Sequence, residues 1–533
     1  MNFQKKIHLI SYLVLFIYLV LGIIIYDDYG ISWDEHFHRI SGFVSLNFFR
    51  DLVGLDIYPG LEHKTDFFKE DTKLYGILFD LPMAFLEKKL SLSDSQEFYY
   101  LRHFSNFFVF YISSIFFYLI LRIRFNALLS LIGLLFWILS PRIFADSFYN
   151  LKDSVFLSFF VISLYFGIKF IDNPSYKNAV FSAITCSLSV GVKILGIISP
   201  FIIIVFFLLQ FADSKKFFKK NFSIFIFFIL LLVSSTILFW PYLWSDPLLN
   251  FIKAIKHFSS QPWPGNIFYL GNYVSAQNLP WHYPIVWILI SSPIIYLAFF
   301  LIGSFFTASR LAKRFINLSA ERKSNDLWRG KNERMDVIFF IIFYFTLFLV
   351  IVLNSTLYGG WRHLYFIYPC LVFLSIKGLE YILIVFKTKY LLLLLIPFLL
   401  FNSFWMYKNH PYQFLFFNKF ATNKPQNLFE LDYWGVSNRS VLNYIIENNK
   451  NTISNIYEFS KSPYALSTYL IDKDKRGRVK FVKNLNEADF LVTNHYYQKG
   501  NPADINNELK NKYKLLKEFT IDGITFNSIY KIR

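Results

Sequence analysis

Two adjacent acidic residues, Asp34 and Glu35, are the side chains of this sequence best suited to chemistry. They lie in the segment Trp33 to His38, a few residues after the first long apolar stretch. Carboxylates at the edge of a bilayer are costly to dehydrate, and they commonly bind a cation or accept a proton. We therefore predict that both are catalytic. They are also the one candidate site for a cofactor, a divalent metal ion, because hard cations favour carboxylate oxygens; two carboxylates alone do not define such a site.

Basic side chains gather at the same ends of the apolar stretches as this acidic pair. Arginine offers phosphate oxygens a planar fork of donors and lysine a point charge. Gly359 and Gly360 would let the backbone approach a ligand closely. One such cation often only anchors a helix to lipid, but several beside two carboxylates indicate a binding site. The residues predicted to bind a phosphate are Arg142, Lys152, Lys193, Arg362 and His363, and those predicted to support them are Arg102, His103 and Asp153.

The elements that must position these residues are membrane-spanning helices. Of the 533 residues, 55% are hydrophobic and 21% aromatic, a content typical of lipid-facing helices. About 20 apolar residues cross a hydrocarbon layer of ~30 Å. We predict a polytopic α-helical membrane protein with about eleven spans, of which the fifth and sixth could be one long span around Lys193. The predicted spans are 7–26, 104–121, 127–144, 153–171, 178–193, 194–212, 222–240, 284–306, 336–354, 363–385 and 390–406.

The loop charges predict how these spans are oriented. A net charge of +18 would suit nucleic acid, but the basic residues fall in alternate loops, which is the positive-inside pattern. We therefore expect no nucleic-acid partner. We expect a multi-pass protein of the cell inner (plasma) membrane with a cytoplasmic N-terminus and a periplasmic or extracellular C-terminal domain. The basic clusters include Lys5-Lys6, Arg122-Arg124, Lys215 to Lys220, Arg310 to Arg334 and Lys387-Lys389.

Most of the loop length falls on the predicted outer side, where we expect the chain to work. In the first outer loop, 27–103, helical spacing predicts surface helices over 33–49 and 74–86. After a transmembrane catalytic domain, 1–406, the polar segment 407–533 predicts a small extracytoplasmic α/β domain. Its opening segment, Asp432 to Gly435, is interpreted as docking it on the membrane domain. Its predicted elements are a helix at 440–447, strands at 452–459, 479–483 and 490–494, and a hairpin over 515–533 that turns at Asp522-Gly523.

The order of these residues resembles a known family. An Asp-Glu pair follows the first span, Pro141-Arg142 and Lys152-Asp153 flank the turn between the third and fourth spans, and Gly359 to His363 opens a late span. This pattern is similar to that of GT-C fold glycosyltransferases. More narrowly, residues 7–406 resemble the bacterial members of the protein O-mannosyltransferase and aminoarabinose transferase group, families 39 and 83, which use polyprenyl-phosphate-linked sugars.

The resemblance implies roles for particular residues. Asp34 matches the family's catalytic carboxylate and Glu35 its neighbour, and outer cations such as Arg142, Lys152 and Arg362 would hold the donor phosphate. The implied reaction moves one hexose or pentose from a polyprenyl (undecaprenyl) phosphate to an acceptor hydroxyl on the outer face, with inversion. The acceptor stays open between lipid, glycan and protein, because the chain lacks the internal soluble domain of the fungal enzymes.

Three other functions stay open at this stage. A flippase or transporter of lipid-linked sugars would want charges deep within helices or symmetric halves. An envelope oligosaccharide ligase or polymerase would take a preassembled glycan from a diphosphate carrier. An inactive membrane scaffold would follow if Asp34 and Arg362 were far apart. The sequence contains no Walker loop, HExxH or CxxC motif that would favour another chemistry.

Overall fold

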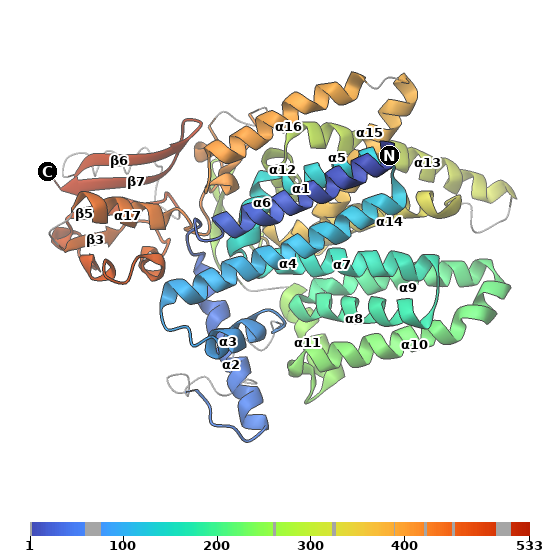
Figure 1. Cartoon of the computed structure of the whole chain (residues 1–533), viewed down its shortest axis with the longest axis horizontal. Helices are drawn as coiled ribbons and strands as arrows, with labels where there is room; N and C mark the ends of the chain where they lie inside the picture. The colour runs from blue at the N-terminus through green and yellow to red at the C-terminus, as the bar shows by residue number, and fades with distance from the viewer. Residues whose placement is uncertain are drawn as a thin grey trace.

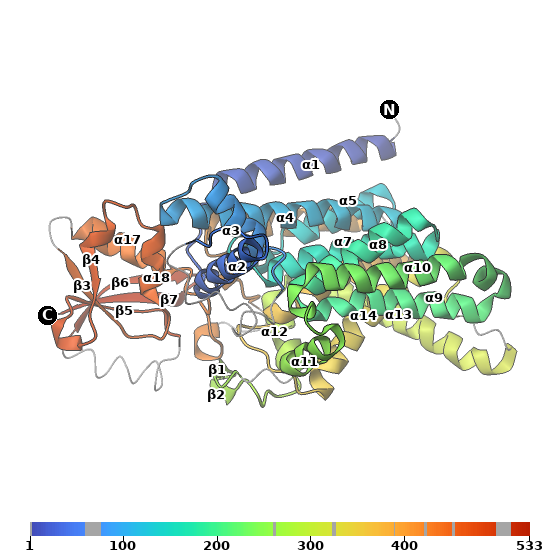
Figure 2. The same cartoon turned by 90° about the horizontal axis from the view of Figure 1, so that it is seen from below.

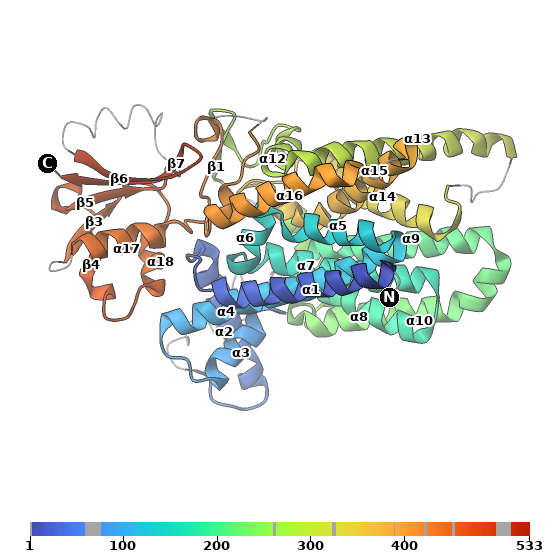
Figure 3. The same cartoon turned by 45° about the horizontal axis from the view of Figure 1, so that its top comes forward.

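Long helices form an elongated bundle, and a small domain with a β-sheet lies at one end of it (Figure 1). The N-terminus of the chain lies at the opposite end of the bundle (Figures 1 and 3). We call these the domain end and the far end. The structure is a computed structural model that describes residues 3–58, 76–259, 263–321, 327–387, 390–419, 424–449, 453–496 and 513–532.

Eight helical segments of the described residues are long and apolar enough to cross a membrane, and a ninth results if α5 (Ala127–Ile138) and α6 (Pro141–Tyr149), bent by 60°, form one span. The polytopic α-helical prediction is thus confirmed, whereas the count of eleven is not. Two shorter helices are α8 (Tyr176–Val192) and α16 (Tyr390–Lys408), and the apolar part of α16 begins at Leu392. The eight segments are α1 (Phe3–Ile25), α4 (Ser95–Arg124), α7 (Asp153–Asp172), the 3-10 helix η3 (Ile194–Ile197) with α9 (Ile198–Asp213), α10 (Lys215–Phe239), α13 (Ile294–Glu321), α14 (Gly330–Val352), and the 3-10 helix η5 (Arg362–Ile367) with α15 (Tyr368–Phe386).

Two of the predicted apolar stretches are interrupted for the same local reason, and a third break separates two predicted spans. Ser140 and Ser292 precede prolines and are extended, because the proline ring disfavours the helical conformation in the residue before it. The first break separates α5 from α6, and the second separates α12 (Tyr283–Ser291) from α13. The third break is at Lys193, which is extended between α8 and η3. The long-span alternative for 178–212 is therefore wrong.

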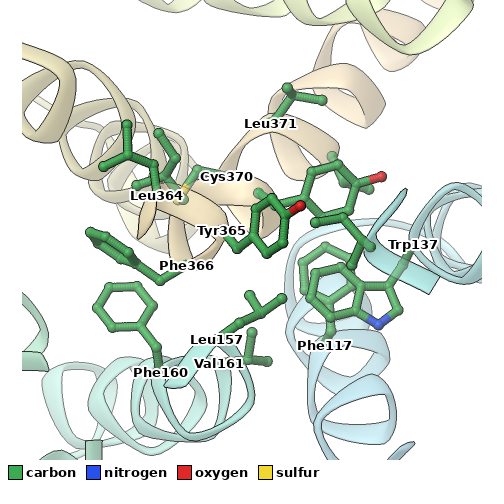
Figure 4. Close-up of a cluster of buried hydrophobic side chains, with 14 of the residues drawn as sticks. Phe117, Trp137, Leu157, Phe160, Val161, Leu364, Tyr365, Phe366, Cys370 and Leu371 are labelled. Carbon is green, nitrogen blue, oxygen red and sulfur yellow. The ribbon is translucent and has the colours of Figure 1, made fainter. Parts of the chain in front are cut away.

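Tight packing fixes the helix that follows Arg362. The backbones of α13 and α15 approach closely at Gly303 and Gly378, where a Cβ on Gly303 would lie 2.0 Å from the carbonyl oxygen of Leu374. Figure 4 shows the buried cluster in which α4, α5 and α7 meet the η5–α15 segment. In it the rings of Phe160 and Phe366 lie 5.0 Å apart. These contacts leave the start of η5 little freedom to move.

The first long loop forms two helices, α2 (Trp33–Leu52) and α3 (Asp80–Lys89). The prediction of a helix over 33–49 is confirmed. The helix predicted over 74–86 begins only at Asp80, and residues 74–75 lie outside the described residues. A later loop contains α11 (Pro247–Ser259) and the antiparallel pair β1 (Asn266–Tyr269) and β2 (Asn272–Ser275).

The C-terminal domain is an α/β domain, as predicted. Its sheet has the order β4-β3-β5-β7-β6, with β3 parallel to β4 and β5 and the other pairs antiparallel. The predicted hairpin turns at Asp522 and Gly523, which both have positive φ; residue 452 of the first predicted strand and the last residue, 533, lie outside the described residues. The elements are α17 (Asn438–Asn448), β3 (Ser454–Glu458), α18 (Tyr464–Ser467), β4 (Val479–Phe481), β5 (Phe490–Thr493), β6 (Tyr513–Ile521) and β7 (Ile524–Ile532).

The segment that opens this domain docks against the start of α2, as the sequence indicated. The amide of Trp33 donates to the carbonyl of Trp434 at 3.3 Å. A Cβ on Gly30 would lie 2.0 Å from the carbonyl oxygen of Val436, so the two backbones touch. Figure 2 shows α2 and α3 beside the C-terminal domain. The docking brings residues from both ends of the chain to one place.

The α13–α15 contact gives a stability prediction. Gly303→Ala places a methyl group against the backbone of α15, and overpacking of this kind costs about 1–3 kcal/mol. We expect a lower Tm for this variant than for the wild type in detergent. Gly477→Ala is the control, because no atom lies within 4 Å of its added Cβ. Equal Tm values for the two variants would contradict the close approach.

Candidate functional site

A cavity of about 560 Å³ lies where α2, the break at Lys193, the start of η5 and the C-terminal domain meet. Five of the ten residues selected from the sequence line it directly, and a sixth, Asp153, bonds two of them. Its polar lining includes Asp34, Lys152, Lys193, Arg362 and His363.

Asp153 is the centre of the charged part of the site. Its carboxylate pairs with Lys193 and, at 2.8 Å, with Nη1 of Arg362. It is the first residue of α7, where the positive end of the helix dipole favours a negative charge. Asn150 donates to the same carboxylate and accepts from the Asp153 amide. Asp153 therefore holds Lys193 and Arg362 in place without lining the cavity itself.

Asp34 completes the charge arrangement on the opposite wall. Its Oδ2 lies 3.9 Å from Nη2 of Arg362, and its side chain is 42% exposed. Asp34 and Arg362 are thus neighbours, which removes the main argument for an inactive scaffold. The exposed carboxylate is the acidic group of the cavity best placed to meet a substrate.

Two largely buried lysines bring positive charge to the cavity wall. Lys152 donates to the carbonyl of Gly76 at 2.7 Å and lies 3.9 Å from Asp80. Burial lowers the pKa of Lys152, against the opposing pull of Asp80. Burial also lowers the pKa of Lys193, against the pull of Asp153. A phosphate bound between the two lysines would favour their charged forms.

The Gly359-Gly360 turn and aromatic rings set the direction of Arg362. Both glycines have positive φ, 65° and 72°, a conformation that other residues rarely adopt. The guanidinium carbon of Arg362 lies 4.7 Å from the ring centre of Tyr358, and the rings of Tyr433 and Trp434 are at 5.2 and 4.6 Å. These rings leave the guanidinium nitrogens of Arg362 facing Asp34 and Asp153.

The side chain of Glu35 lies in the protein interior and not at the cavity where the sequence placed it beside Asp34. It is fully buried, it accepts the Ser32 amide at 2.7 Å, and its other oxygen lies 3.0 Å from Nε2 of His103. It is the third residue of α2 and forms a capping box with Ser32. Glu35 therefore does not line the cavity, and its catalytic role stays a prediction. The two neighbouring carboxylates have different partners, His103 for Glu35 and Arg362 for Asp34. Within the described ranges no group of three or more His, Cys, Asp or Glu could hold a metal ion.

Arg102, His103 and Arg142 also lie outside the cavity. Arg102 pairs with Glu87 at 2.8 Å, and His103 pairs with Glu35, so both tie α4 to the first loop. Neither residue lines the cavity, and their supporting role stays a prediction. Arg142 lies over the rings of Trp287 and Phe417, each at 5.4 Å, in a separate small chamber. Arg142 therefore does not line the cavity of Arg362, and its contact with the same phosphate stays a prediction.

The chamber at Arg142 is lined by two acidic residues, Asp146 and Glu430, and Glu430 is the one that contacts the glycine turn. Its Oε1 accepts the amide of Gly359 at 3.1 Å, and its Oε2 has no hydrogen-bond partner among the described residues. Burial raises the pKa of Glu430 to about 7, although hydrogen bonds from the Gly359 and Gly360 amides lower it. Tyr433 lines both the chamber and the cavity. Glu430 thus supports the turn that carries Arg362.

Several cavity residues were not selected from the sequence. His38 lies one helical turn after Asp34, and this i, i+4 spacing was a usable signal. Trp263 stacks on Tyr358 with ring centres 4.4 Å apart. Tyr433 comes from a segment that was interpreted only as structural. Trp263 lies in a segment of aromatic and proline residues that could stack on a sugar ring or isoprenoid tail or form only an interfacial belt, because aromatic residues in a membrane protein carry little positional information.

Comparison with known proteins supports the resemblance. Residues 102–240 match the family model described as dolichyl-phosphate-mannose-protein mannosyltransferase. This confirms, for that part of the chain, the similarity to membrane glycosyltransferases of this group. A search of curated proteins finds no match.

Three solved structures have related shapes. The Archaeoglobus fulgidus oligosaccharyltransferase in the apo form is 11% identical, with 90% of this chain and 69% of that chain covered and a TM-score of 0.45. The oligosaccharyltransferase AglB from the same organism, in complex with an inhibitory peptide and a dolichol-phosphate, is 12% identical, with coverages of 92% and 66% and a TM-score of 0.45. ArnT from Cupriavidus metallidurans bound to undecaprenyl phosphate is 12% identical, with coverages of 96% and 97% and a TM-score of 0.42.

Glu430 gives a pH-dependent stability prediction. Because its pKa is raised on folding, the stabilisation is complete below the unfolded value of 4.5 and is lost as the pH rises through about 7. A shift of this size corresponds to on the order of 3 kcal/mol. We expect the Tm of the wild type to fall between pH 5 and pH 8 by more than that of Glu430→Gln. The exposed Glu447→Gln is the control and should follow the wild type. Parallel curves for Glu430→Gln and the wild type would contradict this protonation.

Proposed function

We propose that this chain is a membrane glycosyltransferase that moves a single sugar from a polyprenyl phosphate to an acceptor hydroxyl. The observation that carries the proposal is the convergence of Arg362, Lys193, Lys152 and Asp34 on one cavity. Sugar transfer from a lipid phosphate requires a group that stabilises the departing phosphate and a group that receives the acceptor's proton. The cavity contains both kinds of group.

The cations supply the first requirement. Arg362 and Lys193 are already held by Asp153, so little reorganisation is needed when a phosphate arrives. Pre-organised donors aimed at developing charge contribute several kcal/mol to a rate. The phosphate would bond to the face of Arg362 that now faces Asp34 and to the amines of Lys193 and Lys152.

Asp34 supplies the second requirement. Its exposed carboxylate would accept the hydroxyl proton as the oxygen attacks the anomeric carbon, and a single displacement of this kind inverts that carbon. General base catalysis typically contributes 10²–10⁴-fold. No step requires a metal ion, and whether the reaction uses one stays an open part of the proposal.

The rest of the lining suits the donor. A cavity of about 560 Å³ is within the usual range of small-molecule sites and suits one sugar better than a preassembled glycan. Trp263 and Tyr433 offer ring faces for a sugar. The apolar part of the lining, which includes Val190, Val192, Leu195, Val350 and Leu364, suits a polyprenyl chain.

The charges also favour a transferase over a transporter. The cavity cations lie at the domain end, whereas a transporter would carry charges through the middle of the bundle. The basic pair Lys5-Lys6 and the Lys215 to Lys220 cluster belong to the far end, where α1 begins and α9 turns into α10 (Figure 1). The positive-inside rule supports a domain end, and a reaction, outside the cytoplasm, and the plasma membrane is the proposed location. Undecaprenyl phosphate is the proposed carrier.

A transfer assay with purified protein tests the proposal. We expect turnover with some members of a panel of synthetic polyprenyl-phosphate monosaccharides and none with diphosphate-linked oligosaccharides. Asp34→Asn should lower kcat by about 10²–10⁴-fold while the protein still inserts and accumulates. Asp28→Asn is the matched control, because Asp28 pairs with His410 away from the cavity. Near-normal turnover by Asp34→Asn would refute its role as the base. Turnover of only the diphosphate donors would indicate a ligase instead.

The phosphate clamp makes a separate prediction for Arg362. Arg362→Lys keeps the charge but loses the fork, and the loss of one charged hydrogen bond costs about 1.5–3 kcal/mol. We expect the donor KM to rise by roughly 10- to 100-fold. Arg122→Ala is the control, because Arg122 contacts His8 near the start of α1 at the far end. An unchanged KM and kcat for Arg362→Lys would remove this residue from the clamp.

A further inference from the structure

A histidine oriented by a buried carboxylate faces the same cavity. Nδ1 of His38 lies 3.3 Å from Oδ2 of Asp80, and the two residues are 6% and 3% exposed. His38 lines the cavity, and it lies four residues after Asp34 on α2, so both face the same side of that helix. Neither His38 nor Asp80 was selected from the sequence.

The geometry determines which nitrogen can act. With Nδ1 at the carboxylate, the neutral imidazole carries its proton on Nδ1 and its lone pair on Nε2. Within the described part of the chain, no hydrogen bond occupies Nε2. Asp80 remains ionised, because His38 and Lys152 hold its pKa below the usual range although burial alone would raise it. The carboxylate thus fixes the orientation and the tautomer of the ring, as in other His–Asp pairs.

The surroundings of Asp34 suggest a role for a histidine that receives a proton. Arg362 lies 3.9 Å from the Asp34 carboxylate, and a proton that Asp34 takes up there must leave before the next turnover. An imidazole has an ordinary pKa of about 6.5, close to neutral pH, where general bases are most effective. His38 would then act after Asp34 and receive on Nε2 the proton that Asp34 has taken from the hydroxyl.

We propose that His38, oriented by Asp80, is a further catalytic residue of this cavity and the group to which Asp34 passes the acceptor's proton. This inference rests on the proposed glycosyl transfer. The O–H bond of the acceptor breaks, and its proton goes to the carboxylate of Asp34 and from there to Nε2 of His38. The acceptor oxygen forms a bond with the anomeric carbon, whose bond to the phosphate oxygen breaks, and the phosphate leaves with that electron pair. The imidazolium then releases the proton to solvent.

The inference predicts a particular pH dependence. If His38 receives the proton, the acid limb of the pH–activity profile should depend on His38 and on its carboxylate partner. Asp80 pairs with His38, and Lys152 and Arg102 act on Asp80. The other charged groups and histidine of the cavity are Asp34, Lys193, Arg362 and His363. Asp80→Asn removes the carboxylate beside Nδ1, so the acid limb should move to lower pH and the rate should drop.

The test measures kcat and the donor KM from pH 5 to pH 9 for the wild type, His38→Gln and Asp80→Asn. We expect His38→Gln to lose the acid limb and at least about 100-fold in kcat at neutral pH, with little change in KM. His36→Gln is the matched control, since His36 lies on the same helix against Tyr99 and Tyr469. If His38→Gln does not fold, His38→Ala assayed with added imidazole replaces it, and recovered activity is the supporting result.

The outcomes separate this inference from the proposed function. A wild-type protein that is inactive with every donor overturns the proposed function itself. An active wild type whose acid limb and kcat persist in His38→Gln overturns only the role of His38. Failure of imidazole to restore His38→Ala, when that protein is folded and binds donor normally, has the same meaning.

Discussion

The buried ion group of Asp153, Lys193 and Arg362 is the interaction on which the arrangement of the site depends. One carboxylate that is 1% exposed holds two cations that come from segments far apart in the sequence. Removal of one member of such a buried group typically costs on the order of 3–5 kcal/mol, because the others remain without their counter-charge. The start of α7 provides the place for this carboxylate, and Asn150 fixes its orientation. The group therefore joins the break at Lys193 to the turn before η5, and it sets the geometry of the cavity wall.

The breaks in the helices also contribute to the cavity wall. A helix that breaks in hydrocarbon leaves polar backbone groups without partners, so breaks are tolerated where protein or a water-filled cavity surrounds them. The break at Lys193 lies on the cavity, and its lysine side chain takes part in the charged lining. The glycine turn before Arg362 lies between the cavity and the chamber of Arg142 and Glu430. The α13–α15 contact and the aromatic core of Figure 4 hold η5 in place from the other side.

The sequence predicted which charges meet better than it predicted where each side chain points. Helix ends alternate between the two sides of a bundle, so Asp34, Lys152, Lys193 and Arg362 could be assigned to one side from span order and loop charge. Successive residues on a helix differ by about 100° in direction, and no pattern showed that Glu35 would turn inward to His103 while Asp34 faced the cavity. For the same reason Arg102 and Arg142 were assigned to the wrong surroundings. The small domain was predicted almost strand by strand, because alternation and turn residues are local signals. The eleven predicted spans included stretches that Pro141 and Pro293 divide, because their apolar composition hides the break.

The central claim is that the cavity at Arg362 is the binding place of a polyprenyl phosphate. A structure of the protein with undecaprenyl phosphate, determined in lipid nanodiscs, tests it most directly. The account predicts phosphate density between Arg362, Lys193 and Lys152, with the chain running along the apolar wall of the cavity. Phosphate density at another face of the bundle, with this cavity empty in the same particles, would contradict it.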